Sequence, residues 1–367
     1  MPGVVAAVAD RARTLYRGAF GLASTALARP MRPDTVFRIA SLTKVVTSVA
    51  VMMLHEQAGL ELDAPFKRYF PAFRQPPVLT SFERGSRRYT TRPAARDITV
   101  RELLTHTSGY GYWFLNAELR ALFTGDPEYY DPPFVMHEPG SRFQYGIGTD
   151  VLGQLIEPVA GVPLAEFLAR RIFEPLGMHD TSFALPPETR LASLYAVGAR
   201  GLEELPNERA PEGPRGGGAL YSTVDDFLAL LRVLLNDGAA DGTRLLGADS
   251  VRALTSNQIG GLAAERQTSA APPRTADFRF MDGTQKFGLG VLIETRDRAG
   301  GRAAGSRAAG SYSWAGIYNT HFWVDPRAGI AAVVFMQMSP FCAPACLDVC
   351  AAFERAVYED LVRNRRP

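Results

Sequence analysis

Ser41 and Lys44, three residues apart, are the pair whose types and spacing best fit covalent chemistry. Lysine occurs only three times in the chain, and arginine supplies the rest of the 40 Lys and Arg residues. Arginine keeps its proton in proteins, whereas a lysine removed from water can release one. A site that activates a hydroxyl nucleophile through a neighbouring amine would therefore require lysine at this position.

A helix over residues 41–58, ended by Gly59, would place the two side chains on one face. Ser41 would then lie in the first turn, where free N–H groups and the helix dipole favour developing negative charge. The segment is apolar nearly all round, which predicts burial between layers and leaves Lys44 no polar face. The alternative, a serine cap followed by a surface lysine, fits this apolar helix less well.

The composition is that of a globular chain with a large core, because 46% of the 367 residues are hydrophobic. This length allows two domains or one large domain with insertions. The net charge is +2 and no basic block occurs, so nucleic acid is not an expected partner. No leader is seen, and the apolar run 45–54 is too short for a bilayer; we expect a cytoplasmic protein without a membrane partner.

Strand patterns lie at both ends of the chain and helical patterns lie between them. The predicted strands are 4–8, 14–21, 287–294, 317–324 and 330–336. The predicted central helices are 98–105, 149–159, 164–172 and 223–235, with long loops at 198–218 and 260–276, and a closing helix is predicted at 347–363. The simplest assembly is an α+β fold in which the terminal strands form one antiparallel sheet flanked by helices.

This pattern divides the chain into two subdomains with the active site between them. Residues 1–59 and 285–367 would form the α/β subdomain, and residues 60–284 a mainly helical subdomain with long loops.

The three cysteines, Cys342, Cys346 and Cys350, are four apart and would share one helix face as buried structural thiols. Zinc spacings are usually tighter and include a second cluster, so no metal site is expected.

The segment F-R-I-A-S-L-T-K at residues 37–44 resembles the nucleophile motif of the serine β-lactamase-like superfamily. That superfamily includes class C β-lactamases, D-Ala-D-Ala peptidases and family VIII carboxylesterases. Three further segments agree in order: L-L-T-H-T-S-G at 103–109, F-E-P-L-G-M at 173–178 and G-G-G at 216–218. The resemblance covers nearly the whole chain and implies a β-lactamase/transpeptidase-like fold, with Ser41 as the nucleophile and Lys44 as its catalytic partner.

The second motif of the superfamily, Y-x-N or Y-x-S, is represented here by Tyr145 to Ile147. The tyrosine is present, but Ile147 replaces the polar residue that in β-lactamases helps to hold the substrate amide. A phenol beside a lysine cation has its ionised form favoured and can act as a general base. The residues alone leave Tyr145 as a packed aromatic, one of 13 tyrosines; the resemblance implies the catalytic role.

The third motif, K-T-G or H-T-G, is replaced by W-A-G at residues 314–316, which resembles the family VIII esterases. Loss of the cation removes a binder for the carboxylate that β-lactams and D-Ala-D-Ala peptides carry and simple esters lack. The resemblance implies that Gly316 permits close backbone approach and that the N–H groups of Ser41 and Ile317 form the oxyanion hole. Trp314 would line the acyl or alcohol pocket, and a core role is compatible with that.

Tyr110, Tyr112 and Trp113, which follow the T-S-G turn, also resemble the esterase branch and are expected to wall the pocket. The same residues could instead stabilise the helical subdomain.

No G-x-S-x-G or H-E-x-x-H occurs, so the motifs of α/β-hydrolases and zinc proteases are absent. His106 lies in a turn and is expected to be structural, and a Ser–His mechanism through His321 is a minor alternative.

The combined prediction is a serine carboxylesterase that cleaves short-chain acyl esters through a Ser41 acyl-enzyme, with Tyr145 and Lys44 as the base. Release of the acyl group to an alcohol would make it an acyltransferase. The alternative is a β-lactamase or D-Ala-D-Ala carboxypeptidase, against which Ile147 and Trp314 argue. A non-catalytic binding protein is disfavoured because all three catalytic residues are present. The expected partner is a small-molecule ester, without a cofactor; the sequence does not determine the oligomeric state.

Overall fold

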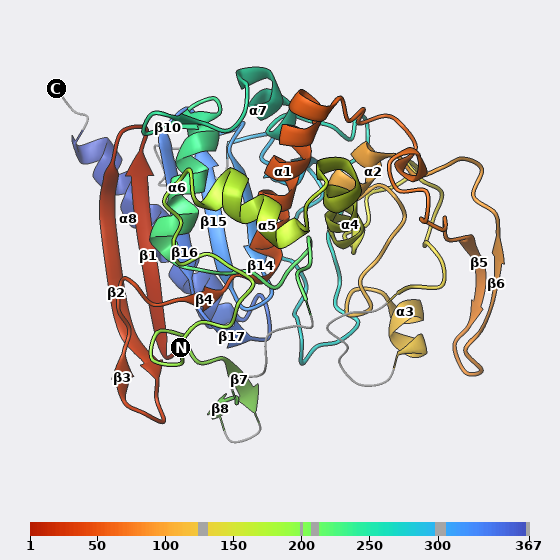
Figure 1. Ribbon diagram of the computed structural model, residues 1–367. Coiled ribbons are helices and arrows are strands. Elements are labelled where there is room, and N and C mark those ends of the chain that lie inside the picture. The colour runs from red at the N-terminus through yellow and green to blue at the C-terminus, as the bar shows by residue number, and fades with distance from the viewer. Residues whose placement is uncertain (124–130, 199–200, 207–212, 298–305, 365–367) are drawn as a thin grey trace.

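The computed structural model describes residues 1–123, 131–198, 201–206, 213–297 and 306–364. An eight-stranded sheet runs through these residues in the order β12-β13-β14-β15-β16-β1-β2-β3 (Figure 1). Its strands are β1 Gly3–Asp10, β2 Thr14–Ser24, β3 Arg29–Pro30, β12 Lys286–Phe287, β13 Leu292–Ile293, β14 Tyr312–Gly316, β15 Thr320–Asp325 and β16 Ile330–Phe335.

The two ends of the chain meet at the centre of this sheet. β1 pairs antiparallel with β2 on one side and with β16 on the other. The β1–β2 turn is closed by Asp10, whose carboxylate accepts hydrogen bonds from the N–H groups of Ala12 and Arg13 at 2.8 and 2.7 Å. The predicted joining of terminal strands into one antiparallel sheet is therefore confirmed.

The sheet buries both faces because alternate side chains of a strand point to opposite sides. Val5, Ala7 and Ala9 lie in the main core with residues of α1 (Thr43–Ala58) and α6 (Val224–Leu235). Ala6 and Val8 lie in a second cluster with residues of α8 (Pro344–Asn364). Figure 1 shows α1 and α6 in front of the sheet and α8 behind it.

Short helices with identifiable ends make up much of the middle of the chain. They are α2 Val100–Leu104, α3 Ala117–Leu122, α4 Gly148–Ala160, α5 Leu164–Leu168 continued by a π-helix at Ala169–Phe173, and α7 Ala248–Leu254. Thr99 and Thr223 cap α2 and α6 by accepting hydrogen bonds from the N–H groups of Glu102 and Asp226. Gly59 and Gly161 end α1 and α4 in the left-handed conformation, as their positions predicted.

Several strands were missed or misplaced. The central region also contains the hairpins β5 Val78–Glu83 with β6 Arg88–Arg92, and β7 Tyr195–Gly198 with β8 Gly201–Glu204, and the short strands β9 Tyr221–Ser222, β10 Ala239–Ala240 and β11 Thr243–Arg244. Two further short strands, β4 Phe37–Arg38 and β17 Met338–Ser339, lie in the terminal segments. The predicted strand 317–324 begins only at Thr320 because residues 317–319 form the β14–β15 turn. The Gly-, Ala- and Arg-rich stretch 298–310, whose composition predicts a hairpin connection, lies partly outside the described residues.

The continuous strand predicted over 287–294 is wrong, because glycines divide it into β12 and β13. Gly290 has a positive φ of 110°, and a Cβ atom there would lie 2.2 Å from the Ser48 Oγ of α1. A Cβ atom on Gly288 would lie 2.0 Å from the carbonyl oxygen of Leu254. The break therefore lets α1 and the end of α7 pack close against this edge of the sheet.

The three cysteines do not share one helix, because Cys342 precedes α8 and has a positive φ of 60°. Cys342 and Cys346 are buried, and Cys346 Sγ lies 3.7 Å from Met338 Sδ. Burial raises the pKa of Cys342 to about 12 and that of Cys346 to about 11. The described thiols are therefore held protonated and unreactive, as a structural role requires.

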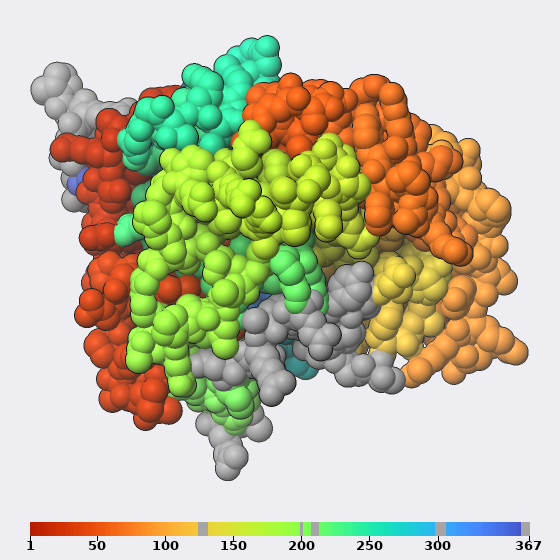
Figure 2. Space-filling model, in the orientation of Figure 1, coloured from red at the N-terminus to blue at the C-terminus, as the bar shows by residue number. Residues whose placement is uncertain are grey.

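None of the described helices is by itself long and apolar enough to cross a membrane. Two consecutive segments, Gly148–Ala160 and Leu164–Phe173, together have the length and composition of a membrane span, but the chain bends by 81° between them. Figure 2 shows the yellow-green segment that carries these helices at the front of the molecule, between the red N-terminal strands and the orange β5–β6 hairpin.

A carboxylate fastens the β7–β8 hairpin to the turn after β2. Glu204 accepts hydrogen bonds from Ser24 Oγ, Tyr195 OH and the Thr25 and Ala26 N–H groups at 2.8 to 3.0 Å. Burial alone would raise the pKa of Glu204, but hydrogen bonds from Ser193, Ala26, Ser24 and Thr25 outweigh it and lower the pKa to about 2. The ionised form is therefore the one that the fold stabilises.

We expect Glu204→Gln to lower the free energy of unfolding at neutral pH. The free energy of unfolding of this variant should also fall less steeply than that of the wild type as the pH is lowered. The folded-state pKa lies below the ordinary 4.5, so the contribution is complete above 4.5 and disappears as the pH falls toward 2. Urea unfolding at about pH 7, 5 and 3 would measure this. The neighbouring, exposed Glu203→Gln is the matched control and should follow the wild type at each pH. Identical pH profiles for the two variants would contradict the assignment.

Candidate active site

Ser41 lies in a 3-10 turn, Ala40–Leu42, immediately before α1, rather than inside the helix as its sequence pattern predicted. The turn is pressed against the end of β14. Thr320 donates a hydrogen bond to the carbonyl oxygen of Ile39 at 3.1 Å, and a Cβ atom on Gly316 would lie 2.4 Å from that oxygen. Gly316 is therefore required for backbone contact between the sheet and the serine turn, and Ile317 follows it directly.

Lys44 is 1% exposed and points from α1 into a polar pocket formed by three oxygen atoms. Its Nζ lies 3.3 Å from Ser41 Oγ and 2.9 Å from Tyr112 OH, and it also donates a hydrogen bond to the carbonyl oxygen of Gly217. A lysine ammonium has three N–H donors and no acceptor. The three oxygens therefore match the protonated form of Lys44, donor for acceptor.

The glycine segment 216–218 passes between α1 and α4 and is held from both sides. Thr47 Oγ1 of α1 donates to the Gly216 carbonyl at 2.7 Å, and the Gly217 N–H donates to Asp150 Oδ1 of α4 at 3.0 Å. A Cβ atom on Gly217 would lie 2.2 Å from Asp150 Oδ2, so a side chain here would displace the Asp150 carboxylate. The G-G-G segment therefore connects α4 to the helix that follows Ser41.

Tyr145 is 3% exposed and presents its ring to Lys44, whose Nζ lies 5.4 Å from the ring centroid. Aromatic rings surround it: His106 lies 4.8 Å away, Trp314 4.9 Å and Tyr112 5.0 Å between ring centroids. Within the described part of the chain, the Tyr145 hydroxyl makes no hydrogen bond. Its hydroxyl is therefore not committed to a structural partner.

His106 is 2% exposed and forms the back of this aromatic group, against Tyr145, Phe143, Phe287 and Trp314. Burial, with a smaller effect of the Lys44 charge, lowers the pKa of His106 well below its ordinary 6.5. Neither ring nitrogen has a hydrogen-bond partner among the described residues. The imidazole is therefore neutral and packs as an aromatic ring, so its contact with Tyr145 adds to the expected structural role.

The chain belongs to the beta-lactamase family. The family model for beta-lactamase matches residues 1–348. The chain is 31% identical to protein Rv1367c of Mycobacterium tuberculosis over 357 residues, covering 93% of this chain and 86% of that one. It is 32% identical to esterase EstB of Burkholderia gladioli, covering 90% and 85%. A mutant of simvastatin synthase (LovD) from Aspergillus terreus superposes with a TM-score of 0.84 at 27% identity, covering 99% and 94%.

In this member of the beta-lactamase family, the tryptophan of the W-A-G segment takes part in the aromatic group. Trp314 is 3% exposed, on β14, and its ring lies 5.3 Å from Phe287 as well as 4.9 Å from Tyr145. The rings of His106, Tyr145 and Phe287 surround Trp314. This wall of the site is apolar.

The predicted pocket aromatics do not all lie together. Tyr112 contacts Lys44 and Tyr145 directly, whereas the Trp113 ring packs at 5.5 Å from Phe114 and under Arg120 at 4.7 Å. Tyr110 is buried, and its backbone packs against Gly146, where a Cβ atom would lie 2.2 Å from the Tyr110 oxygen.

Sequence reasoning missed Phe114 and Phe278, whose rings lie 4.8 Å from Tyr112 and 6.1 Å from Tyr145. Phe278 comes from a long loop without a motif, so no pattern marked it. Asp150 was also missed, although it stands five residues after Tyr145. Within the described ranges no group of three or more His, Cys, Asp or Glu side chains is placed to hold a metal.

His321 stands on the opposite side of β15 from the serine turn. Its neighbour Thr320 contacts Ile39 beside Ser41, and successive side chains of a strand alternate in direction. The His321 ring stacks on Phe341 at 5.9 Å, and burial lowers the pKa of His321 to about 3. This placement disfavours the Ser–His alternative.

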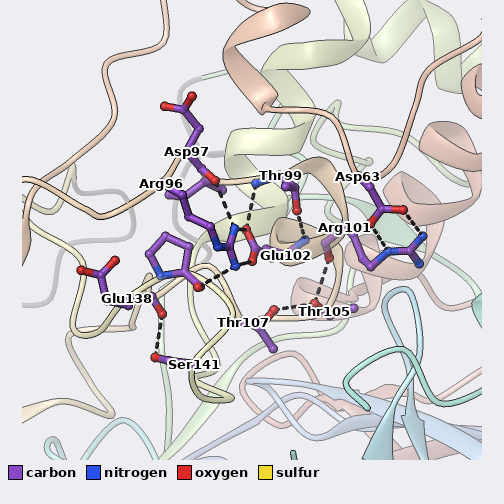
Figure 3. A network of polar contacts seen from close by, with 12 residues as sticks. Asp63, Arg96, Asp97, Thr99, Arg101, Glu102, Thr105, Thr107, Glu138 and Ser141 are labelled. Atoms are coloured by element: carbon purple, nitrogen blue, oxygen red, sulfur yellow. Dashed lines mark hydrogen bonds and ion pairs between the residues drawn. The ribbon is translucent and has the colours of Figure 1, made fainter.

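A polar network around Glu102 supports the turn that carries His106 (Figure 3). Glu102 is 7% exposed, forms an ion pair with both terminal nitrogens of Arg96 and completes a capping box with Thr99. Its carbonyl oxygen accepts hydrogen bonds from the N–H groups of Thr107 and Ser108 at 3.0 and 3.2 Å. Arg96 also binds the Pro139 carbonyl oxygen at 2.7 Å, which connects this turn to the loop that precedes Tyr145.

We expect Glu102→Ala to lower the free energy of unfolding by about 2 kcal/mol, because it removes a cap and leaves Arg96 without its carboxylate. Arg96 is 49% exposed, which keeps the effect below that of a fully buried pair. Urea denaturation would measure the change. The matched control is Glu83→Ala, which breaks the exposed pair with Arg88 and should cost less than about 1 kcal/mol. Equal losses in the two variants would contradict this account.

Proposed function

We propose that the chain is a serine carboxylesterase that cleaves short-chain acyl esters through an acyl-enzyme on Ser41. The observation that carries this proposal is the position of Lys44, with Nζ held by Ser41 Oγ, Tyr112 OH and the Gly217 carbonyl oxygen. Ser41 accepts the hydrogen bond from the ammonium, so the serine proton is directed to another group. The naming of EstB as an esterase, in a relative that shares 32% identity over most of the chain, supports the same activity.

Tyr145 is the proposed base. Its ring lies beside the Lys44 ammonium, whose positive charge favours the phenolate, and its hydroxyl has no other partner among the described residues. The phenolate takes the Ser41 proton as Oγ attacks the ester carbonyl carbon. The resulting phenol then gives this proton to the leaving alkoxide as the tetrahedral intermediate collapses, which leaves an acyl group on Ser41.

The oxyanion of the tetrahedral intermediate is assigned to the backbone N–H groups of Ser41 and Ile317. Close approach of the Ile39 carbonyl oxygen and the Ala40 Cβ atom to Gly316 supports this pairing, because it brings the end of β14 against the serine turn. Trp314, Gly316 and Tyr112 are proposed to line the substrate pocket, and Tyr110 and Trp113 its outer support. Ser41, Lys44 and Trp314 then come from segments 1–59 and 285–367, and Tyr112 and Tyr145 from 60–284, as in the proposed subdomain division.

Neutral esters are the proposed substrates, and a β-lactam or D-Ala-D-Ala peptide is not favoured. The side chain at the third motif is Trp314, whose neighbours are His106, Tyr145 and Phe287 rather than a cation. A substrate carboxylate would have to leave water for this apolar wall without a charged partner. An ester with an uncharged acyl group has no such cost.

The acyl group can leave to water or to an alcohol, and both reactions pass through the same acyl-enzyme. Simvastatin synthase and the methylbutanoyltransferases among the relatives support the second route. An alcohol that binds the aromatic wall in place of water would accept the acyl group with Tyr145 again acting as base. We therefore propose transesterification as a second activity of the same site.

The test is to compare p-nitrophenyl butyrate with a cephalosporin that carries the ring carboxylate, at matched enzyme concentration. We expect kcat/KM for the ester to exceed that for β-lactam opening by at least about a hundredfold. Adding butanol should produce butyl butyrate from the same acyl-enzyme. Faster opening of the cephalosporin would overturn the ester assignment, and release of butyric acid alone in butanol would remove the acyltransferase proposal.

A further inference from the structure

Asp150, on the first turn of α4, contacts two of the three groups that bind Lys44. Its Oδ1 accepts the Gly217 N–H at 3.0 Å, and its Oδ2 lies 3.5 Å from Tyr112 OH, a long contact. Lys44 in turn donates to the Gly217 carbonyl and to Tyr112 OH. Four groups therefore close a ring: Lys44, Gly217, Asp150 and Tyr112.

We propose that Asp150 is a positioning residue for the ester reaction. It orients the Lys44 side chain and favours its positively charged ammonium form. This inference rests on the proposed function, because it concerns how that site prepares its nucleophile. Asp150 does not touch Ser41 in the structure and acts through Gly217 and Tyr112.

The first consequence concerns orientation. Asp150 holds the N–H of Gly217, and the carbonyl on the other side of the same residue is directed at Lys44. Thr47 of α1 holds the Gly216 carbonyl, which belongs to the same peptide as the Gly217 N–H, so α1 and α4 fix this peptide from two sides. Glycine is flexible, and without the carboxylate the backbone at Gly217 could rotate at little cost. Losing that anchor would let Lys44 Nζ move away from Ser41 Oγ.

The second consequence concerns the two tyrosines beside Lys44, whose ring centroids lie 5.3 and 5.4 Å from Nζ. Tyr112 OH faces both the ammonium and the Asp150 carboxylate, so it donates its proton toward Asp150 and accepts from Lys44. The negative carboxylate opposes a phenolate at Tyr112. Tyr145 has no such neighbour among the described residues, and it is therefore the tyrosine left to ionise and act as base.

The third consequence concerns pH. The carboxylate of Asp150 favours the protonated form of each nearby group, so its loss should move both limbs of the pH–rate profile to lower pH. A residue that only supported the fold would lower the rate without moving the profile. Among the described residues, the titratable groups placed around Lys44 are Asp150 on α4, Tyr112, Tyr145 and His106.

The experiment measures kcat, KM and the pH profile of p-nitrophenyl butyrate hydrolysis for Asp150→Asn, Asp150→Ala and a control. Asp150→Asn keeps the shape and an oxygen for the Gly217 N–H but removes the charge. We expect it to lower kcat by roughly tenfold with KM little changed, and to shift both limbs downward. Asp150→Ala should lose roughly a hundredfold, because the anchor is removed as well. Glu157→Gln, an exposed carboxylate on the same helix, is the matched control and should equal the wild type.

Thermal unfolding of each variant separates this role from simple support of the fold. An Asp150→Asn variant with the wild-type melting temperature, a reduced kcat and a shifted profile supports the inference. A wild-type kcat and profile in Asp150→Asn, with the Ser41 variant inactive, would overturn the inference and leave the proposed function intact. Absence of esterase activity in the wild type would instead defeat the proposed function itself.

Discussion

Ser41→Ala is expected to abolish ester hydrolysis, with kcat/KM falling by a factor on the order of 10⁶. The hydroxyl is the only protein group in the proposed mechanism that forms a bond to the acyl carbon, so no neighbouring residue replaces it. Its one described hydrogen-bond contact, from Lys44 at 3.3 Å, is long, so the stability should change little. Hydrolysis of p-nitrophenyl butyrate and the melting temperature, measured on the same preparations, would give both results.

Covalent labelling makes this prediction independent of the substrate. A fluorophosphonate should add its mass to the wild type and not to Ser41→Ala. Ser86→Ala, at the exposed turn of the β5–β6 hairpin, is the control and should retain both activity and labelling. Activity that persisted in the Ser41 variant would show that the nucleophile lies elsewhere and that the Ser-Lys-Tyr assignment is mistaken.

Tyr145→Phe should lower kcat by a factor on the order of 10²–10⁴, because it removes the group that takes and returns the serine proton. The ring remains, so its contacts with His106, Trp314 and Tyr112 are kept and substrate binding should change little. Steady-state kinetics would therefore show the loss in kcat rather than in KM.

The informative comparison is with Tyr112→Phe, because both tyrosine rings lie at nearly the same distance from Lys44 Nζ. Tyr112→Phe removes one acceptor of the ammonium and should cost less than Tyr145→Phe, on the order of tenfold. A larger loss in Tyr112→Phe would reverse the roles of the two tyrosines. Near-full activity of Tyr145→Phe would exclude Tyr145 as the base, and Lys44 alone would then be the favoured base.

The order of the motifs along the chain was enough to predict the fold class and the nucleophile. The S-x-x-K spacing and the apolar segment that follows it made a buried helix the best reading, and α1 is buried over most of its length. The terminal strands have alternating or continuous apolar patterns, and they form one antiparallel sheet. These features are local, because a helix face or a strand face is set by residues close in sequence.

The environment of Lys44 could not be predicted in the same way. The predicted desolvated amine lies instead among three oxygens, and two of them, from Tyr112 and Gly217, come from loops 68 and 173 residues away in the chain. Loop conformation depends on the contacts that a loop makes rather than on a repeating pattern. For the same reason, the sequence did not predict the contacts of Asp150 or the aromatic rings that surround His106.

The sequence by itself determined that this chain carries a serine and a lysine three residues apart at the start of an apolar helix, in a β-lactamase-like order of motifs without the third-motif cation. Only the tertiary structure decided which groups meet that lysine: the Gly217 carbonyl, the Tyr112 hydroxyl with Asp150 behind it, and the Tyr145 ring among His106 and Trp314. The physical reason is that hydrogen bonds and charges act over a few ångströms in space, whatever the separation of the residues in sequence.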